Sequence, residues 1–202
     1  MDKRPYYNKG TCLNLKTSPY ILFLFVDDDE SFWSESEIID YWYNNIEAAT
    51  SFIENEAKKY HYDIKIDKGY YATGIENLRI KYDDVVNTVL EGPIQYDIMD
   101  KIALCLGFES KHDMHSWLKN QVNNEQVGYI VVLNKEGHSH CVNTDDKNFD
   151  ELEFVFQFAR HTGQDRGYPA ALAHEILHLF GAEDCYDPFG KMPKRKNKNE
   201  EF

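Results

Sequence analysis

The sequence predicts a mixed fold of the α/β or α+β class, and three observations lead to it. The apolar run YILFLFV at residues 20–26 is short and runs directly into four acidic residues, which is typical of a buried strand. A long helical pattern follows, and further strand-like runs lie at residues 127–133 and 152–158. This order of elements shows no clean boundary between domains. We therefore expect one domain over residues 1–190 and a charged, disordered tail over residues 191–202.

The long helix is expected to extend from Ser34 to about Tyr60. Ser34 and Glu37 have the S-x-x-E spacing of a capping box at its start. Apolar residues then recur at the spacing of one helix face. They are Ile38, Ile39, Trp42, Ile46, Ala49, Phe52, Ile53 and Ala57.

The other elements follow from periodicity and from turn residues. They are an alternating strand at 63–67, helical pieces within 83–122 that break at Gly92-Pro93 and Gly107, an apolar strand at 127–133, a turn at Gly137 leading to a strand through Cys141, an alternating strand at 152–158, and a helix opened by Pro169. Proline is favoured in the first turn of a helix. The acids at 27–30 lack the spacing and glycine of a calcium-binding EF-hand loop, so we expect a solvated strand end there.

Composition limits the partners that we expect. The formal net charge of −13 repels nucleic acid phosphates and anionic membrane surfaces. No signal peptide is visible, and the apolar run at 20–26 is far too short to cross a bilayer. The four cysteines form no CxxC pair, so reduced, mostly buried thiols are expected. These features favour a soluble cytoplasmic protein.

The last predicted helix carries the motif HEILH at residues 174–178. Residues four apart lie on one helix face, so His174 and His178 can occupy two adjacent corners of a tetrahedral zinc site. Glu175 lies about 100° further round the helix, where it can take a proton from a metal-bound water. The helix is apolar nearly all round, which predicts burial on every side. A metal ion would offset the cost of burying these three polar side chains.

A third metal ligand is expected beyond the helix, because a continuing helix would carry later residues out of reach. Gly181 can end the helix in a left-handed conformation and turn the chain back. The acids after that turn are Glu183, Asp184 and Asp187. Spacing alone leaves the choice among them open.

The segment HEILHLFGAED fits H-E-x-x-H-x-x-G-x-x-D and resembles the extended zinc motif of metzincin-type metalloproteases. Its longer form, with Tyr186 and Asp187, looks like that of immune inhibitor A-type peptidases. The resemblance implies His174, His178 and Asp184 as the Zn²⁺ ligands, with Glu175 as general base. It also implies a zincin-like fold in which a small mixed sheet and a long backing helix precede a buried active-site helix, with a minimal lower subdomain.

The function expected from this resemblance is zinc-dependent hydrolysis of peptide bonds in a peptide or protein substrate. Tyr186 is a candidate to stabilise a developing oxyanion, and Tyr168 is a weaker one. The strand at 127–133 is a candidate edge against which a substrate could lie. His138 and His140 alternate on a predicted strand and could bind a metal, although surface histidines beside a turn are commoner.

Two alternatives to the peptidase stay open at this stage. The segment LHLFGAED faintly resembles a histidine-rich segment of bacterial endoribonucleases that act in ribosomal RNA maturation. Those enzymes use three histidines and lack the glutamate, and the acidic charge of this chain disfavours RNA. The other alternative is a zincin fold without catalytic activity that serves as a binding module. The presence of Glu175 disfavours it.

Overall fold

The structure is a computed structural model that describes residues 15, 18–70, 80–82, 86, 94–142, 152–160 and 167–182. Its helical elements, of which η1 is a π-helix, are α1 (Glu35–Tyr41), η1 (Trp42–Ile46), α2 (Glu47–Lys59), α3 (Ile94–Cys105), α4 (Lys111–Val122) and α5 (Pro169–Leu179). Its strands are β1 (Tyr20–Asp27), β2 (Asp67–Tyr70), β3 (Ile80–Lys81), β4 (Val127–Glu136), β5 (His140–Val142) and β6 (Phe154–Arg160). The predicted mixture of strands and helices is confirmed.

The strands form a mixed sheet in the order β2-β1-β4-β6-β5, and β3 also pairs with β1. β1 runs parallel to β2, β3 and β4, and β4 runs parallel to β6. Among the described strands only β5 is antiparallel, and it pairs with β6. Parallel neighbours need a crossover, and helices supply it from β1 to β2 and from β3 to β4.

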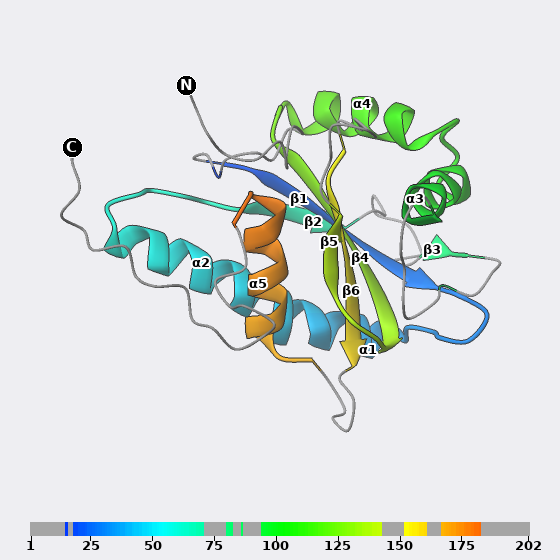
Figure 1. The fold of residues 1–202 in the computed structure, drawn as a ribbon, viewed down its shortest axis with the longest axis horizontal. Helices are drawn as coiled ribbons and strands as arrows, with labels where there is room; N and C mark the ends of the chain where they lie inside the picture. The colour runs from blue at the N-terminus through cyan, green and yellow to red at the C-terminus, as the bar shows by residue number, and fades with distance from the viewer. Residues whose placement is uncertain are drawn as a thin grey trace, which may run out of the picture.

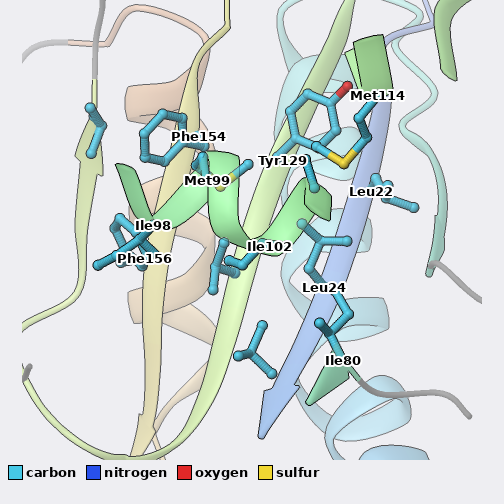
Figure 2. Close-up of a cluster of buried hydrophobic side chains, with 14 of the residues drawn as sticks. Leu22, Leu24, Ile80, Ile98, Met99, Ile102, Met114, Tyr129, Phe154 and Phe156 are labelled. Atoms are coloured by element: carbon cyan, nitrogen blue, oxygen red, sulfur yellow. The ribbon is translucent and has the colours of Figure 1, made fainter. Parts of the chain in front are cut away.

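Side chains of the central strands alternate between two apolar layers. On β1, Ile21, Phe23 and Phe25 pack with α1, α2 and α5, which defines the α5 face of the sheet. Leu22 and Leu24 pack with α3 and α4 on the opposite side, which is the α3–α4 face. Figure 1 shows these two helix layers on either side of the sheet. Figure 2 shows the core of the α3–α4 face, where side chains of both helices meet those of the strands.

Two predicted strands lie in the interior of the sheet. The sequence of residues 127–133 fits an edge strand or an ordinary core strand, and the structure shows the core strand, because β4 lies between β1 and β6. The alternating pattern at 152–158 suggests one exposed face, but β6 is buried at every position from Phe154 to Ala159. Helices cover both sides of the sheet here, so neither face of β6 reaches solvent.

The predicted long helix is confirmed as the continuous run α1–η1–α2. The backbone N–H of Glu37 donates to Ser34 Oγ at 3.3 Å, and the N–H of Ser34 donates to Glu37 Oε2 at 3.0 Å, so the predicted capping box is present. The π turn η1 was not predicted from the sequence. Beyond it, Ala49 and Ile53 remain on the buried side and pack on the α5 face.

The acidic run at 27–30 is only partly the solvated strand end expected from the sequence, since Asp29 and Glu30 are exposed but Asp27 and Asp28 are buried. Asp28 accepts hydrogen bonds from the backbone N–H groups of Glu30, Ser31 and Val86, and its carboxylate pairs with the Lys135 ammonium. Burial alone would raise the pKa of Asp28, but these donors hold it below its ordinary value. The charge is therefore compensated inside the fold and joins the loop after β1 to β4.

Smaller differences concern where strands begin and pair. In residues 62–66, Ile64 and Ile66 are buried as the alternation predicts, but the strand begins only at Asp67. The strand after the turn at Gly137 forms as β5, but its partner is β6 rather than the preceding strand. The predicted helical pieces are confirmed as α3 and α4, which are separated at Gly107. The predicted break at Gly92-Pro93 and the predicted tail at 191–202 lie outside the described residues.

Two further expectations concern thiols and membranes. The sequence favours mostly buried cysteines, but of the two that the structure describes, Cys105 is exposed and Cys141 is half-buried; Cys12 and Cys185 lie outside the described residues. Among the helices that the structure describes, none combines the length and the apolar character that a membrane span requires.

Candidate metal centre

Helix α5 carries the candidate site on the α5 face. Pro169 opens it as predicted, and Tyr168 is its N-cap residue. One side of the helix packs into the apolar layer through Leu172, Ala173 and Ile176. The expectation of burial on every side is wrong, because Leu177 is exposed and the two histidines are only half-buried. The apolar sequence of α5 therefore packs on one side, and the histidines remain within reach of solvent.

The two histidines of the motif face each other across one helical turn. The Nε2 atoms of His174 and His178 lie 2.9 Å apart, and the rings meet edge to face with centroids 4.3 Å apart. The i, i+4 spacing on a helix produces this arrangement, as the sequence predicts. Two imidazole nitrogens therefore converge on one point at the surface of α5.

The helix end fixes the orientation of the second ring. His178 Nδ1 lies 2.7 Å from the carbonyl oxygen of Ala182, which lies just beyond the last turn of α5. Gly181 has a φ of 85°, so the predicted left-handed helix end is confirmed. A carbonyl oxygen only accepts hydrogen bonds, so Nδ1 donates to it and Nε2 keeps the lone pair.

Glu175 follows His174 on the helix and is buried, with 7 % of its surface exposed. Its position about 100° round the helix from His174 places it on a different side from the pair of imidazoles. The carboxylate is therefore buried, while the two imidazoles are half-buried. The structure thus keeps the predicted base and the predicted ligands on one short helix.

The converging nitrogens fit a zinc ion. With Zn–N bonds of about 2.0–2.1 Å, tetrahedral coordination holds two nitrogen ligands roughly 3.3 Å apart. The observed 2.9 Å between the Nε2 atoms is a hydrogen-bond distance, about 0.4 Å shorter than that spacing, and imidazole nitrogen is a common zinc ligand. Asp184, its rival Glu183 and the candidate Tyr186 lie outside the described residues. Within the described ranges, no group of three or more metal-binding side chains occurs.

Other candidate residues from the sequence do not join this site. His140 Nδ1 lies 3.0 Å from the carbonyl oxygen of His138, and His140 Nε2 lies 3.3 Å from Gln95 Nε2. The His140 ring also packs against Phe156, which belongs to the α3–α4 face. Burial lowers the pKa of His140. Tyr168 is exposed at the start of α5, at the opposite end of the helix from Ala182.

One element next to the site was not identified as such from the sequence. β5 lies at one margin of the sheet, opposite to the margin formed by β2, and α5 contacts it. Cys141 of β5 packs against the apolar layer of the α5 face, on the side of the motif helix. A turn followed by a short strand through Cys141 was predicted from the sequence, but the place of that strand in the sheet depends on pairing with β6.

No family model, curated protein or solved structure matches this chain, so the interpretation of the site depends on the residues of the chain themselves.

Proposed function

We propose that this protein is a zinc-dependent peptidase with a zincin-like arrangement of a sheet, a long backing helix and a motif helix. The observation that carries the proposal is the convergence of His174 Nε2 and His178 Nε2 at 2.9 Å, on the same helix as the buried Glu175. The resemblance of the segment at 174–184 to metzincin-type motifs supports it. Asp184 is proposed as the third ligand.

Each residue of the proposed site then has its own role in the reaction. When bound, zinc supplies a Lewis acid and lowers the pKa of a coordinated water. His174 and His178 hold the ion through their Nε2 atoms. Glu175 accepts the proton of the attacking water at its carboxylate and delivers that proton to the nitrogen of the leaving amine. Tyr186 is proposed to donate a hydrogen bond to the carbonyl oxygen of the scissile bond as negative charge develops on it.

The sheet margin supports a peptide as the substrate. Among the described strands, β5 lies at one margin of the sheet and pairs with β6. Backbone N–H and C=O groups at a sheet margin can bind an extended chain as an added strand. α5 contacts β5, so a peptide bound along this strand would pass beside the helix that carries His174 and His178. β5 replaces residues 127–133 as the proposed substrate strand.

The first test is metal content. Chelator-free protein, purified and reconstituted with zinc, is expected to hold about one zinc per chain by elemental analysis. Cobalt(II) should give the absorption bands of a tetrahedral site with nitrogen and oxygen ligands. Metal well below one per chain in both preparations contradicts the proposal.

The second test separates the peptidase from its alternatives. Glu175→Gln keeps the size of the side chain but cannot accept a proton at neutral pH, so it should retain zinc and lower hydrolysis by roughly 10²–10⁴-fold. Wild type and Glu175→Gln are compared by proteome-wide cleavage and on a panel of RNAs. Glutamate-dependent peptide cleavage supports the proposal, and RNA cleavage that needs His174 and His178 favours the endoribonuclease. If wild type and Glu175→Gln both bind zinc and behave alike on every substrate, the peptidase proposal fails and the binding module without catalytic activity is favoured.

A further inference from the structure

We propose that the left-handed turn at Gly181 is a positioning device that orients the His178 ring through the carbonyl group of Ala182. The inference depends on the proposed function for its use, because it concerns how one metal ligand is held.

Backbone hydrogen bonds define the turn. The N–H of Gly181 donates to the carbonyl oxygen of His178 at 2.9 Å, and the N–H of Ala182 donates to that of Leu177 at 3.0 Å. These two bonds are those of a Schellman motif, in which the residue after the helix end takes a left-handed conformation. Gly181 takes this conformation, with a φ of 85°. The chain reverses here, and the Ala182 carbonyl comes to lie 2.7 Å from His178 Nδ1.

This hydrogen bond decides which nitrogen of His178 can bind a metal. Because the carbonyl only accepts, the proton of the neutral ring resides on Nδ1, and the lone pair on Nε2 points toward His174. In metal sites, a ligand histidine commonly donates its other N–H in this way, which fixes both the tautomer and the ring orientation. The turn therefore does more than end the helix, since its carbonyl prepares His178 as an Nε2 ligand.

Glycine is needed at position 181 because residues with a Cβ rarely adopt this backbone conformation. Alanine there would strain the turn or shift it, and either change moves the Ala182 carbonyl away from the imidazole. Asparagine tolerates the left-handed region better than alanine does. The substitution Gly181→Asn should therefore preserve more of the geometry than Gly181→Ala.

The chain offers a matched control at the end of α3. Gly107 has a φ of 88°, its N–H donates to the carbonyl oxygen of Leu104 at 2.9 Å, and the N–H of Phe108 donates to that of Ala103 at 3.0 Å. This is the same motif as at Gly181, and a Cβ on Gly107 would meet no atom within 4 Å. It lies at the end of a helix on the α3–α4 face. The substitution Gly107→Ala therefore imposes the same backbone strain away from the histidines.

The experiment compares the zinc and cobalt(II) affinity of wild type, Gly181→Ala, Gly181→Asn and Gly107→Ala by chelator competition. Both alanine variants should lower the midpoint of denaturant unfolding by similar amounts. Gly181→Ala should weaken metal binding by roughly 10–100-fold, the usual cost of losing the partner of a ligand histidine. Gly107→Ala should bind as wild type does, and Gly181→Asn should recover most of the loss. Equal affinities of Gly181→Ala and Gly107→Ala overturn the inference.

A second readout in metal-free protein keeps this test separate from the proposed function. Nitrogen-15 NMR of the imidazole should show His178 with its proton on Nδ1 in wild type and in Gly107→Ala. In Gly181→Ala the two tautomers of His178 should interconvert, so that the chemical shifts of its two ring nitrogens become averaged. If wild type binds no zinc, the proposed function fails, and the NMR comparison still decides whether the turn sets the tautomer. An unchanged tautomer in Gly181→Ala overturns the inference even if metal binds.

Discussion

Two histidine sites lie on opposite faces of the sheet and differ in how their nitrogens are used. On α5, His174 and His178 are half-buried, and their Nε2 atoms face each other at 2.9 Å. On α4, His115 is buried, and its Nδ1 lies 2.9 Å from the hydroxyl of Tyr129 on β4. His115 Nε2 is enclosed and meets no hydrogen-bond partner in the described part of the chain.

The surroundings of His115 make it a poor site for any charge. Burial lowers its pKa to about 4, and the positive charges of Lys119 and His112 add to this effect, while Glu125 opposes it. A neutral ring held by a tyrosine in an apolar layer is a packing element. The comparison teaches that burial and partner geometry, rather than residue type, separate a structural histidine from a candidate metal ligand.

The largest expected effect is the loss of metal from one site only. His174→Ala and His178→Ala should each weaken zinc binding by more than the roughly 10–100-fold expected when a ligand loses only its hydrogen-bond partner. His115→Leu should leave zinc content unchanged, because His115 lies on the other face of the sheet. Elemental analysis after dialysis measures this. Zinc loss in His115→Leu as well would contradict the distinction between the sites.

The second effect is a dependence of stability on pH that arises at His115. Its pKa falls from an ordinary 6.5 to about 4 on folding, so the unfolded chain binds more protons between these values. The stability contribution is present above pH 6.5 and is lost as the pH falls toward 4, by on the order of 3 kcal/mol in total. Urea unfolding of wild type and His115→Leu across this window measures it. A constant difference between the two free energies of unfolding at all pH values would show that His115 does not titrate this way.

A third prediction concerns the ligand beyond Gly181. Asp184→Ala should lower zinc affinity at least about tenfold, while Glu183→Ala should change it little, since the motif places the aspartate three residues after the glycine. Chelator competition on both variants provides the measurement. The reverse ranking would move the assignment to Glu183.

The smallest effect is expected at the partner of His115. Tyr129→Phe removes the hydroxyl that meets His115 Nδ1 and should lower the free energy of unfolding by about 1 kcal/mol. Zinc affinity should stay at the wild-type value. Denaturant unfolding and chelator competition on the same sample test both parts, and a change in zinc affinity would show that the two faces are coupled.

Several features were predictable because they depend on residues close together in the chain. The capping box of Ser34 and Glu37, the start of α5 at Pro169 and the left-handed Gly181 all follow local rules of helix ends. The facing of His174 and His178 follows from the helical repeat alone. By itself, then, the sequence determined the motif helix, its two histidines and its end.

Other features were decided only by the tertiary structure, because they depend on contacts between distant parts of the chain. The sequence pattern of β4 fits an edge or a central strand equally well, and only pairing with β1 and β6 makes it central. The charge of the buried Asp28 is compensated in part by Lys135, more than a hundred residues away. Likewise β5 lies beside α5 because β6 pairs with it. Strand order and the partners of buried charges depend on long-range packing, which local periodicity does not encode.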